Sequence, residues 1–220
     1  KNTLIIGVKE DPANLIIGNS LLEKGYHHIY LYVDEFPANN ELSLEISCNG
    51  LHVLRLLQNN TEYEISNIVS VYCRPYPNDV FNIKHQSSIV ERFLHRECYA
   101  LLRMIWETLP IKNCLWVNPW SNSEMAENKG LQMRLATQLG LCIPKTIITG
   151  SKKRAENFIK DLKKENKQVV LKTITGFRNQ ERGERGGAFV TTITDEELGF
   201  KNYPLVLQEY VEKDYELRIT

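Results

Sequence analysis

The sequence lacks long hydrophobic runs and an excess of charge of either sign. Its longest apolar stretches, such as residues 4–7 and 15–17, are far too short to cross a bilayer. The 27 basic and 27 acidic residues cancel, whereas general nucleic-acid binding favours a basic excess. The first residues lead straight into a strand-like run, without the features of an export signal. These absences argue against nucleic acid or a membrane as a partner and predict a cytoplasmic protein.

Paired cysteines and metal motifs are also missing. The five cysteines are scattered and form no C-x-x-C pair, which is typical of ordinary thiols in a reducing compartment. The five histidines show no H-E-x-x-H spacing, so the sequence predicts no metal-ligating set. The turn at residues 7–12 lacks G-x-G-x-x-G, which disfavours a dinucleotide oxidoreductase.

The sequence does contain alternating strand and helix patterns, which predict an α/β fold. Asp11-Pro12 fits a helix start, Leu15 and Leu22 give that helix an apolar face, and Gly25 suits its end. With its flanking strands, this helix forms the β-α-β unit that opens a Rossmann-like sheet. The strands expected in the first part of the chain are 3–8, 28–33, 42–46, 68–73 and 115–117.

Two further helices are predicted from apolar spacing. The first spans 88–109, and its apolar positions include Phe93 and Met104. Residues 121–124 fit a capping box that opens the second, which ends at Gly140. The apolar stripe of this second helix consists of Leu131, Leu135 and Leu139.

From about residue 143 strand patterns become more frequent. Ser151 suits the N-cap of a helix with an inward face of Ala155, Phe158, Ile159 and Leu162. We place a boundary near residue 118, which divides the chain into domains 1–118 and 119–220. Because Thr220 ends the chain inside a strand-like run, we expect residues to be missing beyond it. The strands expected here are 145–149, 168–173, 188–193, 205–210 and 215–220.

Four segments of the second domain could together hold a nucleoside triphosphate. Lys129 and Lys172 could meet the phosphates as point charges from two different elements. Glycines let backbone N–H groups approach phosphate oxygens closely, and the loop at 182–187 is rich in them. The glycines of this loop are Gly183, Gly186 and Gly187.

The remaining segments could recognise the nucleoside. Glu209, which follows Gln208 at the end of an apolar strand, could accept a hydrogen bond from the adenine amino group. The backbone of Tyr210 and Val211 could pair with the ring edge, and Glu216 could accept from ribose hydroxyls. Taken singly, each segment also fits a solvated lysine, a plain hairpin loop or the wet face of a strand pair. The order and spacing of all four favour the nucleotide site.

This order resembles the ATP-grasp superfamily and, within it, the graspetide (microviridin-type) peptide ligases. The matching segments are 116–119, 128–129, 139–146, 170–172 and 208–211. Segments similar to the N-terminal domain of that family are 10–11, 35–37, 69–75 and Glu97. The resemblance implies a Rossmann-like, pre-ATP-grasp domain followed by an incomplete ATP-grasp α+β region, truncated at Thr220.

By this resemblance Lys129, Lys172 and the glycine loop contact the phosphates of ATP, residues 208–211 face adenine, and Glu216 binds ribose. Arg218 matches an arginine near the phosphates or the acyl phosphate and is the predicted catalytic residue. The Mg²⁺ ligands of the family lie beyond the position of Thr220, so we expect this piece alone to be inactive. Arg74 could line the cleft or serve the turn that it begins.

The chemistry implied is ATP-dependent ligation within a ribosomally made precursor peptide. An Asp or Glu side chain becomes an acyl phosphate, and a Ser, Thr or Lys side chain then displaces phosphate, forming a macrolactone or macrolactam. A leader segment of the precursor would dock elsewhere. The alternatives are an ATP-grasp ligase that adds an amino acid to a protein or small molecule, and a non-catalytic peptide- or nucleotide-binding module. The sequence does not indicate an oligomeric state, although cytosolic enzymes of this size often form homodimers.

Overall fold

The computed structural model describes residues 2–50, 52–74, 80–109, 114–174, 191–192 and 203–217. The fold is mixed α/β, and the chain divides into two compact units, Lys1–Glu127 and Asn128–Thr220. Among the described residues, none of the helices combines the length and the apolar character needed to cross a membrane.

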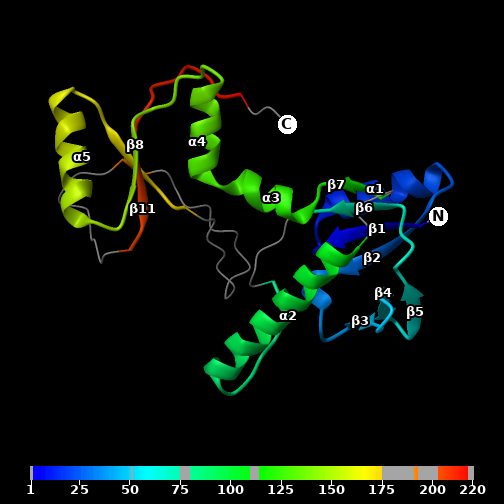
Figure 1. Cartoon of the computed structure of the whole chain (residues 1–220). Helices are drawn as coiled ribbons and strands as arrows, with labels where there is room; N and C mark the ends of the chain where they lie inside the picture. The colour runs from blue at the N-terminus through cyan, green and yellow to red at the C-terminus, as the bar shows by residue number, and fades with distance from the viewer. Residues whose placement is uncertain are drawn as a thin grey trace. The chain divides into compact units, whose positions relative to one another are not determined.

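A four-stranded parallel sheet forms the centre of the first unit (Figure 1). Its strand order is β2-β1-β6-β7, and every neighbouring pair is parallel. Helix α1 connects β1 to β2, so the predicted β-α-β unit is confirmed. The bounds are β1 (Asn2–Gly7), α1 (Pro12–Glu23), β2 (His27–Tyr32), β6 (Ser70–Cys73) and β7 (Leu115–Val117).

Alternate side chains of each strand point to opposite faces of this sheet. Other elements cover both faces, as is usual for a parallel sheet. Leu4 and Leu31 belong to the large core that also contains residues of α2 (Ser88–Thr108). His28 and Tyr30 point to the other face, where Gly18 of α1 lies against them. A Cβ atom at Gly18 would lie 1.9 Å from the Tyr30 hydroxyl oxygen, so only glycine allows this approach.

The ends of α1 confirm the prediction, but its inward face does not. Asp11 is the N-cap, and Gly25 follows the last turn with a φ of +78°. Leu15 and Leu22, predicted to face inward, are 49% and 55% exposed. The helix packs so closely on the aromatic side chains of β2 that small or polar residues fit best. Its buried residues are Asn14 and Gly18.

Helix α2 has nearly the predicted span, and its predicted apolar face is confirmed in part. Ile105 is fully buried and Leu101 packs against the core, whereas Phe93 and Met104 are 56% and 53% exposed. Only the C-terminal half of the helix reaches the core, and this half supplies the buried residues Leu102, Ile105 and Trp106.

A three-stranded antiparallel sheet, in the order β3-β4-β5, adds to the same core. Strand β3 was predicted from the sequence, whereas β4 and β5 were not. Asn59 and Asn60, with φ of 51° and 58°, form the two-residue turn between them. Two such residues between apolar runs are a recognised hairpin signal, so the sequence contained the clue. The bounds are β3 (Asn40–Ile46), β4 (His52–Gln58) and β5 (Thr61–Glu64), and a 3-10 turn, Val33–Glu35, precedes them.

The single helix predicted after residue 121 is wrong, since two helices occupy this region. Helix α3 (Trp120–Glu127) begins before Ser121, which therefore lies inside the helix and not at a capping box. Helix α4 (Lys129–Gln138) begins after Asn128, whose side chain accepts a hydrogen bond from the Leu131 amide at 2.9 Å. Trp120 is buried in the first core, so α3 belongs to the first unit.

The second unit contains an antiparallel sheet in the order β10-β9-β11-β8. Helix α5 packs on one face of it through the predicted residues Ala155, Ile159 and Leu162, with Phe158 alongside (Figure 1). Ser151 caps this helix as predicted, accepting from the Arg154 amide at 3.4 Å. The bounds are β8 (Thr146–Thr149), α5 (Lys152–Lys164), β9 (Val169–Lys172), β10 (Thr191–Thr192) and β11 (Leu205–Glu209).

Two predictions about the edges of this unit are wrong. The predicted strand 215–220 is absent from its described part, residues 215–217, where Tyr215 and Leu217 are 76% and 77% exposed. A strand needs a neighbour for its backbone hydrogen bonds, and none of the described strands pairs with these residues. The apolar stripe of α4 is not buried either, since none of its residues is buried and Leu139 is 79% exposed.

Candidate functional site

The strand register of the second sheet brings Lys172, Gln208 and Thr146 to one face. Val206 of β11 lies opposite Lys172 of β9, and Gln208 lies opposite both Val170 of β9 and Thr146 of β8. Residues paired in this way point to the same side of an antiparallel sheet. Leu207 and Val169 point to the other side, into the core beneath α5. The polar face is therefore the one opposite α5.

The polar side chains on this face are joined by hydrogen bonds. The Lys172 ammonium donates to Gln208 Oε1 at 2.6 Å, and Gln208 Nε2 donates to Thr146 Oγ1 at 2.8 Å. The Thr146 hydroxyl donates to the Pro144 carbonyl oxygen at 2.8 Å. All three side chains are half-buried. A cation is thus held at a defined place on the sheet and has further N–H donors to offer an anion.

Apolar side chains lie directly beside this cation. Val170 and Val206, which face the same side as Lys172, are only 3% and 6% exposed. These two valines are therefore buried, and the positive charge of Lys172 lies beside packed apolar side chains.

Glu209, predicted to face adenine, has its carboxylate on the opposite side. It follows Gln208 along β11, so it points to the face that α5 covers, and it accepts from Lys167 Nζ at 2.7 Å. The hydrogen bond from Lys167, and then the backbone N–H of Lys145, lower the pKa of the Glu209 carboxyl. This carboxylate is used in an ion-pair network and does not lie beside Lys172.

Part of the backbone after β11 also forms hydrogen bonds within the protein. The Tyr210 amide donates to the Gln168 carbonyl oxygen at 2.9 Å, so this N–H is occupied. Within the described part of the chain, the Val211 amide has no such bond. Of the two predicted backbone partners for a purine edge, Val211 is therefore the better placed donor.

Lys129 and Glu216 are not brought into contact with the Lys172–Gln208 pair. Lys129 is exposed at the start of α4, where its Nζ lies 3.4 Å from Gln132 Oε1. Glu216 is exposed and forms a local ion pair with Lys213. The remaining predicted site residues lie outside the described residues: Gly183, Gly186, Gly187 and Arg218.

Arg74 makes a structural contact at the end of β6. Its Nε donates to Asp11 Oδ2 at 2.7 Å, while Asp11 Oδ1 accepts from the Ala13 amide. The hydrogen bond to Asp11 raises the pKa of Arg74 above its ordinary value. Arg74 thereby joins the end of β6 to the N-terminus of α1, which favours the turn-stabilising role over the cleft.

Metal ligands and reactive thiols are not apparent in the described ranges. No group of three or more His, Cys, Asp or Glu side chains there is arranged to hold a metal ion. All five cysteines are free thiols, and burial raises the pKa of Cys73 to about 12. Cys73 therefore stays protonated and is a poor nucleophile.

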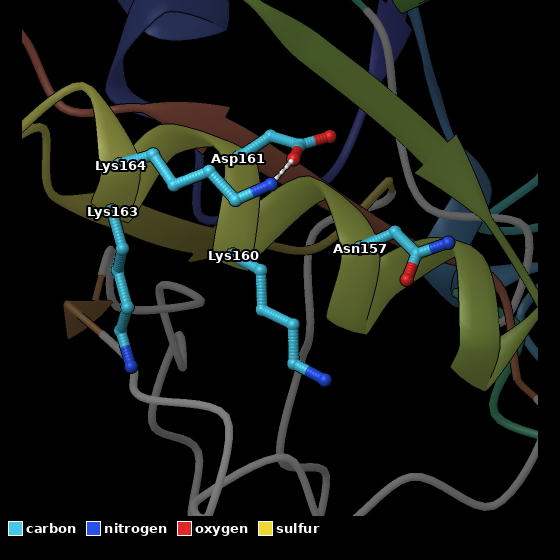
Figure 2. A pocket seen from close by; sticks show the side chains of 5 residues that line it. All are labelled: Asn157, Lys160, Asp161, Lys163 and Lys164. Atoms are coloured by element: carbon cyan, nitrogen blue, oxygen red, sulfur yellow. Dashed lines mark hydrogen bonds and ion pairs between the residues drawn. The ribbon is translucent and has the colours of Figure 1, made fainter.

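A polar hollow of about 630 Å³ lies on the outer side of α5, away from the Lys172 face (Figure 2). Asp161 accepts from Lys164 at 2.8 Å, while Lys160 and Lys163 extend away from that pair. Asn157 completes the lining. Long charged side chains in such an open hollow are typical of a solvated surface, so its size does not make it the functional site.

Solved structures provide the decisive comparison for the fold. The macrocyclase MdnC bound with precursor peptide MdnA, from Microcystis aeruginosa MRC, aligns over 95% of this chain and 68% of its own, with a TM-score of 0.81 and 20% identity. A RiPP-associated ATP-grasp ligase from Chryseobacterium gregarium, in complex with ADP and a leader and core peptide, aligns over 97% and 64%, with a TM-score of 0.76 and 22% identity. The chain has the fold of an ATP-grasp ligase.

The macrocyclase MdnB from Microcystis aeruginosa MRC shares this ATP-grasp fold, with a TM-score of 0.74 and 23% identity over 97% of this chain and 69% of its own. The chain thus spans about two thirds of the length of these ATP-grasp proteins. No protein-family model and no curated protein matches it at the sequence level. The resemblance inferred from motif order is confirmed at the level of fold.

Proposed function

We propose that this protein is an ATP-dependent carboxylate ligase that links side chains within a precursor peptide. An Asp or Glu carboxylate attacks the γ-phosphate of ATP, giving an acyl phosphate and ADP. A Ser, Thr or Lys side chain then attacks the acyl carbon, releases phosphate and closes an ester or amide ring. The carboxylate is a poor acyl donor until phosphate becomes its leaving group, which is why ATP is required.

One observation carries this proposal: a half-buried lysine, held by Gln208 on the face opposite α5, in a fold shared with ATP-grasp ligases. Phosphoryl transfer depends on positioning and charge neutralisation more than on covalent help from the protein. Lys172 supplies one fixed positive charge, held by Gln208. The ADP and peptides bound to the related Chryseobacterium ligase are consistent with the same use here.

The other predicted roles belong to the same proposal. Lys129 and the loop of Gly183, Gly186 and Gly187 would contact the phosphates, and Arg218 the acyl phosphate. The backbone of Tyr210 and Val211 would face adenine, and Glu216 would bind ribose. Mg²⁺ would supply charge neutralisation. A leader segment of the precursor would hold the core peptide.

We also propose the finer architecture that the motifs indicated. Residues 1–118 would form the Rossmann-like, pre-ATP-grasp domain, and residues 119–220 the first part of the ATP-grasp region. The all-parallel order β2-β1-β6-β7 supports the former, and the sheet with Lys172 supports the latter. A cytoplasmic location would fit the ATP requirement.

The test compares two lysines of the same unit in the full-length protein. Lys172→Ala is expected to weaken ATP binding by about 1.5–3 kcal/mol, because a hydrogen bond to a charged group is lost. Lys160→Ala, on the outer side of α5, is the matched control and should bind like wild type. Isothermal calorimetry measures both, and equal affinities for the two variants would refute the nucleotide assignment.

A second measurement addresses the reaction. Incubation with ATP, Mg²⁺ and the precursor peptide encoded nearest the gene should remove the mass of one water per ring, detected by mass spectrometry. A mass gain on a protein or small molecule would instead identify an amino-acid ligase. ATP binding without turnover would identify a binding module.

A further inference from the structure

Thr146 lies at the base of the hydrogen-bond chain that holds Lys172. The chain runs from Lys172 Nζ to Gln208 Oε1 (2.6 Å), from Gln208 Nε2 to Thr146 Oγ1 (2.8 Å), and from Thr146 Oγ1 to the Pro144 carbonyl oxygen (2.8 Å). Lys172, Gln208 and Thr146 come from β9, β11 and β8, and Pro144 lies two residues before β8 begins. The series of hydrogen bonds therefore crosses three neighbouring strands.

The direction of every hydrogen bond in this series is fixed by the groups at its two ends, Lys172 and Pro144. A lysine ammonium can only donate, and the Pro144 carbonyl can only accept. The single hydroxyl proton of Thr146 is used on Pro144, so its oxygen must accept from Gln208. The Gln208 amide therefore has one permitted orientation, with its NH₂ group toward Thr146 and its oxygen toward Lys172. The reverse orientation would place two donors against each other at Lys172.

We propose that Thr146 is a positioning residue for nucleotide binding, which it serves by orienting the Gln208 amide and thereby holding Lys172. This inference rests on the proposed function. The ammonium has three N–H donors and spends one on Gln208, which leaves two for phosphate oxygens. A lysine already held in place loses less conformational freedom when the anion binds, and such preorganisation increases affinity.

The same geometry changes the part assigned to Gln208. Its amide oxygen and one N–H are already used on Lys172 and Thr146, on the face beside Val170. Gln208 thus acts on the nucleotide through Lys172, and one N–H of its amide is left over. Removing the Thr146 hydroxyl would leave the amide free to rotate and Lys172 without its fixed acceptor.

The test uses two substitutions at one position in the full-length protein. Thr146→Val keeps the β-branched shape that suits a strand and removes the hydroxyl, whereas Thr146→Ser keeps the hydroxyl. Thr146→Val should weaken ATP and ADP binding about fivefold, the effect of one lost hydrogen bond. Thr146→Ser should restore wild-type affinity. In turnover, the valine variant should raise KM for ATP while kcat stays within about twofold.

A double-mutant cycle separates positioning from a general structural effect. If Thr146 acts through Lys172, Thr146→Val should have little effect on ADP affinity in a Lys172→Ala background. Gln208→Met removes both the oxygen and the nitrogen of the amide, so it should weaken ADP binding as Thr146→Val does. It replaces Thr146→Val in the test if that variant folds poorly. The inference is overturned if Thr146→Val weakens ADP binding equally in the wild-type and Lys172→Ala backgrounds, or if Thr146→Ser does not restore wild-type affinity. Either result leaves the proposed function intact. If Lys172→Ala itself leaves affinity unchanged, the proposed function fails first and the inference falls with it.

Discussion

The two four-stranded sheets of this molecule use their faces in different ways. The parallel sheet of the first unit is covered on both sides, by α1 on one and by the core with α2 and β4 on the other. The antiparallel sheet of the second unit packs one face on α5, while its other face carries Lys172, Gln208 and Thr146. The first arrangement is suited to stability, and the second places polar chemistry on a rigid surface.

This contrast shows how one chain separates a packed face from a polar face. In an antiparallel sheet, a period of two lets every strand give one side chain to the core and the next to a site. Leu207 and Gln208 are neighbours in β11 with these opposite uses. Breaking either use separately should therefore be feasible, and the following substitutions do so in order of expected effect.

The largest effect is expected from Leu207→Ala, which opens the small core beneath α5. Leu207 is fully buried, and truncation of such a residue costs about 3 kcal/mol. All three tryptophans, Trp106, Trp116 and Trp120, lie in the first unit, so their fluorescence reports on that unit alone. Chemical denaturation followed by circular dichroism should show an earlier transition, while the fluorescence transition stays in place. A matching shift of both signals would mean that the two units unfold as one.

A smaller effect, in the first unit, is expected from Gly18→Ala. The added methyl would meet the Tyr30 hydroxyl at 1.9 Å, and overpacking of this kind costs about 2 kcal/mol. Here the fluorescence transition should move to lower denaturant. Gly130→Ala, in the second unit, is the control and is followed by circular dichroism, since the atom nearest to its added methyl, Asn128 Oδ1, lies at 3.4 Å and alanine favours a helix. Unaltered stability of the Gly18 variant would contradict the close packing of α1 on β2.

The smallest effect concerns the ion pair between Lys167 and Glu209 at the edge of the second sheet. The folded-state pKa of Glu209 is below its ordinary value of 4.5, chiefly because of the hydrogen bond from Lys167. The contribution of the Lys167–Glu209 ion pair to folding stability is therefore present above pH 4.5 and lost as the pH falls through the folded-state pKa of Glu209. Lys167→Met should raise the Glu209 pKa toward 4.5 in an NMR titration, whereas Lys164→Met, whose partner is Asp161, should not. If the Glu209 pKa stays low in the Lys167→Met variant, the shift is due to Lys145 instead.

Much of the local structure could be predicted from the sequence. The caps at Asp11 and Ser151, the glycine after α1 and the inward face of α5 follow from short-range rules, and all are confirmed. The hairpin turn at residues 59–60, which was not predicted, also has a local signal in its two asparagines. The order of nucleotide-site motifs indicated the fold, and the similarity to solved ATP-grasp ligases confirms that part.

The sequence by itself thus determined the fold class, most of the elements and several of their ends, because caps, turns and periodicity act over a few residues. Only the tertiary structure decided which face each side chain occupies. Strand register is set by contacts between distant segments, and a shift of one residue moves every side chain to the other face. That is why Lys172 and Gln208, 36 positions apart, lie within hydrogen-bonding distance, while Glu209, next to Gln208, points the other way. For the same reason, no local pattern could have singled out Thr146.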